Sequence, residues 1–244
     1  ILGPLSWHVR SRTSHEGFTT QHRIIGISAA WAIFFLGVLY AVTLVLGLLS
    51  LKSPQDPIGD PFFSILELLL VLMAPLMVVI MVAVHAYAPP DAKAYSLTAL
   101  ALMIIAAGIT SSVHFVILTV SRQMEATGLP WVSLFLSFKW PSVAYTLDIL
   151  AWDLFFALSM LWAAPVFKVG RLETAVRILM TVSGILSLAG LIGVPLADMQ
   201  VRMIGVLGYA TVPPIAFLLL GIVFRRIQRV PGQTVGSPGS QSGA

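Results

Sequence analysis

Six long apolar segments constrain the fold of this chain more than any other feature of its sequence. A helix needs roughly 20 apolar residues to cross about 30 Å of hydrocarbon, because it rises about 1.5 Å per residue. Segments of this length occupy residues 24–51, 62–87, 95–121, 142–167, 174–197 and 203–224. Lipid offers the backbone no hydrogen-bond partners, so each segment must satisfy its own backbone as a helix. The sequence therefore predicts an all-α polytopic transmembrane helix bundle with about six spans.

The composition excludes an ordinary soluble protein. Of the 244 residues, 58% are hydrophobic and 10% are charged, whereas a soluble domain carries about 25% charged residues. The chain has no cysteine, so disulfides and thiolate metal sites are excluded. Its basic residues flank the apolar segments, where they set topology and contact anionic lipid. The lipid bilayer is the expected partner and nucleic acid is not, while an oligomer stays open.

The segments between the spans divide the chain into three parts. Residues 1–23 form a cytoplasmic N-terminal segment, residues 24–224 the six-helix transmembrane domain, and residues 225–244 a basic tail that becomes disordered. The tail has little to bury, since it is mostly Gly, Ser, Gln and Pro. Residues 131–140 are apolar but too short to span, and we interpret them as an interfacial or re-entrant piece.

The distribution of Lys and Arg predicts that both termini are cytoplasmic. With an inner N-terminus, ten basic residues flank the inner ends of the spans and four flank the outer ends. The inner ten are Arg10, Arg12, Arg23, Lys93, Lys168, Arg171, Arg177, Arg225, Arg226 and Arg229; the outer four are Lys52, Arg122, Lys139 and Arg202. This bias agrees with an even number of spans.

Four ionisable residues lie inside the apolar segments, toward the outer side of the predicted membrane. An ionised side chain near the bilayer centre costs at least about 2.5–3.5 kcal/mol, so such residues face the bundle interior and often mark function. Glu67 is expected about 8 Å, and His114 and Asp148 about 10 Å, below the outer boundary. Asp153 is expected near the middle of the membrane. His85 lies near the inner end of its segment, where an interfacial anchor is the simpler interpretation.

The functional interpretation of these four residues is a polar cavity that opens outward. Thr110 and Ser111 precede His114 by one turn, so their hydroxyls are expected to orient its ring. Carboxylates with one imidazole can bind a small solute, relay a proton or hold a cation, with His114, Glu67 and Asp148 as the possible metal ligands. The alternative is that each residue is satisfied by a partner and only fixes helix packing.

The spacing of two aspartates weakens the interpretation as a single site with four ligands. Asp148 and Asp153 are five residues apart, which corresponds to about 140° around an α-helix. We therefore expect one of the two carboxylates to face a different neighbour.

Two segments carry a family resemblance. The run from His85 to Ser96, HAYAPPDAKAYS, and the run from Gly108 to Phe115, GITSSVHF, resemble uncharacterised bacterial multi-pass membrane proteins of unknown function. The resemblance implies a bacterial inner-membrane setting. It implies no activity, so it assigns no residue roles.

Three function classes remain open on the sequence. The first is a membrane protein that binds or transports a small solute, a proton or a cation through the outward-facing polar cavity. The second is a structural or partner-binding membrane subunit, and the third is a membrane-embedded, metal-assisted enzyme that acts on lipid. No Walker loop, dinucleotide fingerprint or His-Glu-x-x-His pair occurs in the sequence, so no catalytic residue or cofactor is assigned.

Overall fold

A computed structural model describes residues 17–53, 56–125 and 127–227 of the chain. Within these residues the secondary structure is helical, and six helices are long and apolar enough to cross a membrane. They span Thr20–Leu49, Phe62–Tyr87, Pro90–Met124, Val143–Val166, Arg171–Gly193 and Met199–Arg226. The predicted all-α bundle with six spans is confirmed. Most of the predicted N-terminal segment and nearly all of the predicted tail lie outside the described residues.

Several spans are built from more than one helical element. The first two are the single helices α1 (Thr20–Leu49) and α2 (Phe62–Tyr87). The third contains α3 (Lys93–Val116), a π-helical turn (Ile117–Ser121) and α4 (Arg122–Glu125). The fourth contains α6 (Val143–Ile149), a π-helical segment (Leu150–Phe156) and α7 (Ala157–Ala163). The remaining helices are α5 (Val132–Phe135), α8 (Arg171–Gly190), α9 (Met199–Ala210) and α10 (Val212–Arg226).

The sixth span begins earlier than its apolar pattern suggested. We expected it to start at residue 203, but α9 begins at Met199. The carboxylate of Asp198 accepts hydrogen bonds from the backbone N–H groups of Gln200, at 2.8 Å, and Val201, at 3.2 Å. This N-cap stabilises the first turn. Arg202, expected at the outer boundary, therefore lies inside a helix and is only 3% exposed.

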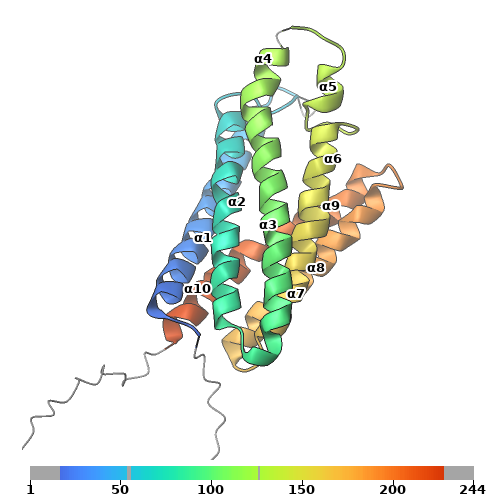
Figure 1. Cartoon of the computed structure of the whole chain (residues 1–244). Helices are drawn as coiled ribbons and strands as arrows, with labels where there is room; N and C mark the ends of the chain where they lie inside the picture. The colour runs from blue at the N-terminus through green and yellow to red at the C-terminus, as the bar shows by residue number, and fades with distance from the viewer. Residues whose placement is uncertain (1–16, 54–55, 126, 228–244) are drawn as a thin grey trace, which may run out of the picture.

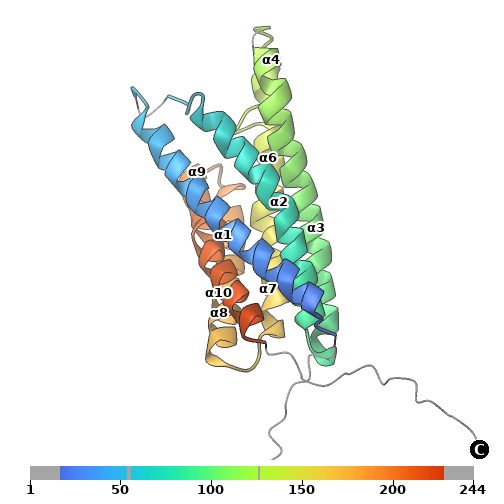
Figure 2. The same ribbon diagram turned by 90° about the vertical axis from the view of Figure 1, so that its left-hand side faces the viewer.

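The start of α1 and the end of α10 lie at the same end of the bundle (Figures 1 and 2). There Arg23 Nη1 donates a hydrogen bond to the carbonyl of Ile227, at 3.3 Å. We call this the terminal end. The opposite, distal end holds the end of α1, the start of α2 and the start of α6, and α4 and α5 lie beyond it (Figure 1).

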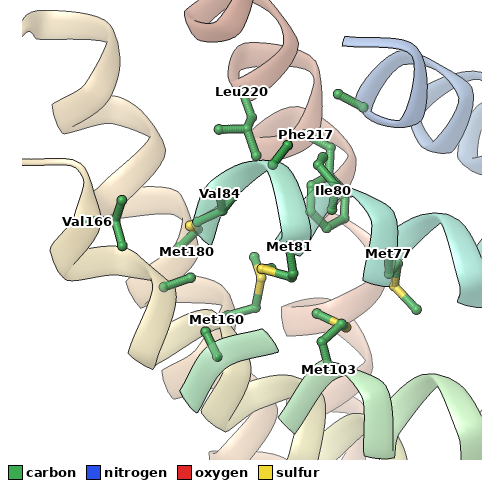
Figure 3. Packing of buried hydrophobic residues seen from close by; sticks show 14 of the residues in the cluster. Met77, Ile80, Met81, Val84, Met103, Met160, Val166, Met180, Phe217 and Leu220 are labelled. Carbon is green, nitrogen blue, oxygen red and sulfur yellow. The ribbon is translucent and has the colours of Figure 1, made fainter. Parts of the chain in front are cut away.

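The main apolar core fills the terminal half of the bundle. Methionine side chains from four helices meet there (Figure 3). Met81 on α2, Met103 on α3, Met160 on α7 and Met180 on α8 are fully buried, and Phe217 on α10 is 1% exposed. Flexible thioether side chains fill irregular gaps between helices that cross at different angles. The core leaves the terminal half of the bundle interior apolar and closely packed.

Residues 131–140 form α5 and a loop at the distal end rather than a further span. Trp131 and Phe135 are each 46% exposed, and their rings contact edge to face with centroids 6.3 Å apart. This segment connects the third span to the fourth, which carries two of the buried carboxylates described below.

Candidate functional site

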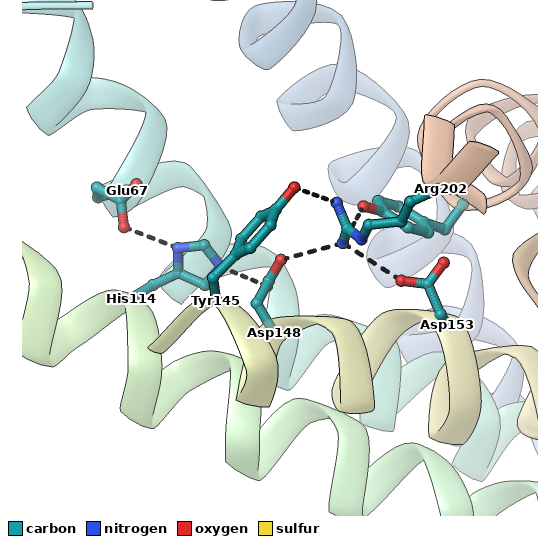
Figure 4. A network of polar contacts seen from close by, with 7 residues as sticks. Glu67, His114, Tyr145, Asp148, Asp153 and Arg202 are labelled. Atoms are coloured by element: carbon teal, nitrogen blue, oxygen red, sulfur yellow. Dashed lines mark hydrogen bonds and ion pairs between the residues drawn. The ribbon is translucent and has the colours of Figure 1, made fainter. Parts of the chain in front are cut away.

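Five ionisable side chains are buried together in the distal half of the bundle. They come from α2, α3, the fourth span and α9, and Figure 4 shows them in a continuous row across these helices. The exposed fractions are 4% for Glu67, 3% for His114, 9% for Asp148, 0% for Asp153 and 3% for Arg202. We call these five residues the buried charge network. Isolated charges in an apolar bundle are costly, so their mutual contacts are what make their burial tolerable.

The imidazole of His114 stands between two carboxylates. Its Nδ1 forms a hydrogen bond with Glu67 Oε2 at 2.7 Å, and its Nε2 lies 3.3 Å from Asp148 Oδ1. A neutral imidazole carries one N–H and an imidazolium carries two. Each ring nitrogen therefore faces a group that can share a proton with it. The number of protons held by these three side chains decides which of the two contacts is a hydrogen bond.

Arg202 closes the other end of the network. Its Nη2 donates to Asp153 Oδ2 at 3.2 Å and lies 3.8 Å from Asp148 Oδ2. The guanidinium also donates to two phenols, Tyr145 at 2.8 Å and Tyr209 at 3.1 Å. Its carbon lies 4.7 Å from the centroid of the Tyr145 ring, a cation–π contact. Arg202 thus ties α9 to the fourth span through both of that span's buried carboxylates.

The expectation that one of the two carboxylates faces a different neighbour holds only in part: among the described contacts Asp148 lies against His114 and Asp153 does not, but Arg202 contacts both. The expectation assumed an uninterrupted α-helix. The segment Leu150–Phe156 is π-helical, with hydrogen bonds from i to i+5, and this wider turn brings residues five apart closer to one face. A π-helical segment inside a longer helix often occurs at a functional site.

Two glycines make room for Asp153 where α8 and α9 cross. A Cβ atom added to Gly205 would lie 2.0 Å from Asp153 Oδ1, and one added to Gly190 would lie 2.7 Å from the same oxygen. Neither position therefore tolerates a side chain while Asp153 stays in place. The glycines let the carboxylate approach the helix backbones closely and keep it directed at Arg202.

The hydrogen bonds of the network are not saturated. Within the described part of the chain, four of its buried atoms have no hydrogen-bond partner: His114 Nε2, Asp148 Oδ1, Asp153 Oδ1 and Arg202 Nε. Buried polar atoms without a hydrogen-bond partner are uncommon in folded proteins. Two of them, on His114 and Asp148, face each other.

The structure brings together four of the residues singled out in the sequence, Glu67, His114, Asp148 and Asp153, and leaves two out. Thr110 is 1% exposed and Ser111 is partly buried, yet neither hydroxyl hydrogen-bonds to the His114 ring in the described structure. Instead, a carboxylate lies beside each ring nitrogen. The charged groups are also buried against one another, whereas the sequence predicted that they line an open cavity.

Sequence reasoning missed Arg202, Tyr145 and Tyr209. Arg202 was assigned to an outer loop because the sixth apolar segment was started too late. A signal was present: Asp198 precedes Arg202 by four residues, as an N-cap precedes the first turn of a helix. The tyrosines gave no comparable signal, because aromatic residues near span ends are ordinarily interfacial anchors.

The arrangement does not fit a metal centre. The described residues contain no group of three His, Cys, Asp or Glu side chains that could hold a metal ion. The reason is visible in the triad proposed from the sequence: Glu67 and Asp148 lie against opposite nitrogens of His114, so the three side chains do not converge on one point. The network suits proton sharing better than metal coordination.

No protein-family model, curated protein or solved structure matches this chain.

Proposed function

We propose that this integral membrane protein is a proton transporter whose proton-binding site is the buried charge network. The observation that carries the proposal is the His114 ring with a carboxylate at each nitrogen, buried within the spans. Chains of Asp, Glu and His inside transmembrane helices are typical of proton relays. Reversible protonation of this triad is the chemistry that its geometry supports best.

Of the three ligand classes left open by the sequence, the proton fits this network best. A solute site needs polar groups that converge on a shared space, whereas these groups converge on one another. The net charge of the network also allows it to bind protons. Three carboxylates opposed by one guanidinium leave two negative charges, so two protons shared among His114 and the carboxyls make the network neutral. Neutrality favours burial in a low-dielectric bundle.

The packing of the bundle favours a carrier over an open channel. The main apolar core lies between the network and the terminal end, and its central side chains are fully buried. Protons that enter the network from the distal end therefore cross the terminal half only when the helices move. Slow, carrier-type turnover is the expected behaviour.

We place the terminal end in the cytoplasm of a bacterial inner membrane. The support is the excess of Lys and Arg at the terminal end and the sequence resemblance described above. The burial of Arg202 strengthens the bias, because it removes one of the four basic residues assigned to the outer side. With this orientation the network takes protons from outside the cell.

Vesicles that contain the purified protein and a dye for internal pH test the proposal. With an imposed membrane potential, we expect the wild type to admit protons faster than protein-free vesicles. His114→Gln should lower the rate of proton entry about 100-fold or more, the scale of loss when a proton-transfer group is removed. His85→Gln is the matched control: His85 lies at the terminal end, where its Nδ1 is 2.9 Å from Ser96 Oγ.

Two results would contradict proton transport. One is a wild-type protein that admits protons no faster than protein-free vesicles. The other is a His114→Gln variant that folds, as judged by size-exclusion chromatography and thermal unfolding, and conducts like the wild type. A lower melting temperature for His114→Gln, together with a wild type that does not conduct protons, would favour the structural subunit instead.

A further inference from the structure

A thin layer of aromatic and apolar side chains covers the network on its distal side. The ring of Phe138 lies over the ring of His114, with centroids 5.2 Å apart and an angle of 30° between the planes. Phe138 also meets Tyr145 edge to face at 6.4 Å, and Tyr145 lies under the guanidinium of Arg202. One side chain of the loop between α5 and α6 therefore covers the imidazole at the centre of the triad.

The cover is small compared with the packing on the other side of the network. Three buried residues, Val113, Ile117 and Ala144, form the distal cluster, and Phe63, Leu136 and Phe138 pack against it from positions that are only partly buried. The terminal side is sealed by the main core, which includes residues from all six spans. Water reaches a buried group along the side that takes least energy to open, which here is the distal side.

The loop that carries Phe138 is held mainly by local hydrogen bonds. Ser142 donates to the carbonyl of Ser137, and Ser137 donates to the carbonyl of Ser133 at 2.6 Å. These bonds are local to residues 133–142, so opening residues 136–140 breaks only local hydrogen bonds. Its helical turn α5 exposes Leu134 by 50% and Phe135 by 46%, and its anchors are the buried Val132 and the contact of Trp140 with the Tyr145 ring.

We infer that Phe138 is a gate: displacement of residues 136–140 lifts its ring from His114 and admits water to the network from the distal end. The role of this gate rests on the proposed function, because the gate is the route by which protons reach the network. The movement itself does not depend on proton transport. The closed position of Phe138 keeps the triad dry, and the main core prevents access from the terminal end at the same time. A carrier with alternating access opens its site to one side of the membrane at a time, and Phe138 controls the distal opening.

The absence of native cysteine allows a direct test by labelling. Ala144→Cys places a thiol in the distal cluster beneath Phe138, at a position that is 7% exposed. A membrane-impermeant methanethiosulfonate reacts only with a thiol that water reaches. Adding Phe138→Ala should make labelling from the distal side about tenfold faster, corresponding to about 1.4 kcal/mol less stabilisation of the closed segment.

Matched variants control this experiment. Leu134→Ala truncates an exposed apolar side chain of the same segment and should leave the rate of labelling at position 144 unchanged. Phe138→Leu keeps an apolar cover and should give a rate between those of the Ala144→Cys parent and its Phe138→Ala derivative. Lys52→Cys and Lys168→Cys, at exposed positions near the two ends of the bundle, report which face the reagent reaches.

Three results would overturn the gate. They are an unchanged labelling rate for the Ala144→Cys thiol when Phe138→Ala is added, faster labelling from the terminal side, and an equal acceleration by Leu134→Ala. Labelling measures water access without any proton flux, so its outcome is independent of the vesicle experiment. Accelerated labelling without proton transport would support the gate and contradict the proposed function. Proton transport without accelerated labelling would contradict the gate alone.

Discussion

Replacing Arg202 with methionine should be among the most damaging single substitutions in this protein. We expect a loss of about 3–5 kcal/mol in the free energy of unfolding, the usual effect of removing one partner from a buried ion pair. Asp148 and Asp153, at 3.8 and 3.2 Å from Nη2, would lose their shared cation. Methionine replaces the aliphatic stem of the arginine, so the loss would come mainly from charge and hydrogen bonding. Denaturant unfolding in detergent micelles measures it.

Arg122→Met is the matched control for this substitution. Arg122 Nη2 lies 2.5 Å from Asp60 Oδ1, and the two side chains are 37% and 51% exposed. The hydrogen bond from Arg122 holds the pKa of Asp60 below its usual range, but exposed pairs contribute only about 0–1 kcal/mol. Arg202→Met combined with Asp153→Asn should recover part of the loss, because one unpaired carboxylate is removed. Equal losses for the two arginine variants would show that Arg202 is not a buried counter-charge.

Gly205→Ala should destabilise the protein through a single methyl group. The added Cβ would lie 2.0 Å from Asp153 Oδ1 and 3.1 Å from Gly190 Cα, so α9 or the carboxylate must move. We expect a cost of about 1–3 kcal/mol, which is typical of overpacking, together with a weaker contact between Asp153 and Arg202. Thermal unfolding measures the first effect, and the vesicle assay should show slower proton entry.

Gly108→Ala adds the same methyl group, but we expect it not to destabilise the protein. Gly108 lies within α3, is exposed, and has no atom within 4 Å of an added Cβ. Alanine at such a position raises helix stability by about 0.5–1 kcal/mol in water, so no destabilisation is expected. The close approach at Gly205 would be contradicted if both alanine variants unfolded at the same temperature as the wild type.

The six spans could be predicted from the sequence because a bilayer permits few alternatives. Uninterrupted apolar length is a strong signal, and lipid requires helices to satisfy their own backbones. The error at the start of the sixth span came from counting Arg202 as a boundary residue. A buried arginine and a boundary arginine look alike in a hydropathy pattern, and only the cap at Asp198 distinguishes them here.

The candidate site could be predicted in part. Glu67, His114, Asp148 and Asp153 were singled out because each is costly in an apolar segment, and that cost draws them together in the fold. The contacts among these four residues could not be predicted from the sequence. The π-helical segment Leu150–Phe156 leaves no recognisable pattern, yet it changes which side chains share a face. The gate residue was equally hidden, because Phe138 covers His114 through the path of a loop.

The most direct test of reversible protonation is nitrogen NMR of the histidine rings in lipid. The chain has five histidines, and His114→Gln identifies the signals of the ring in the network. We expect both nitrogens of His114 to change with pH in the wild type, and Glu67→Gln to alter that change while leaving His85 as it was. A His114 ring that titrates independently of Glu67 and Asp148, or that shows one unchanging state at every pH, would contradict a shared proton in this network.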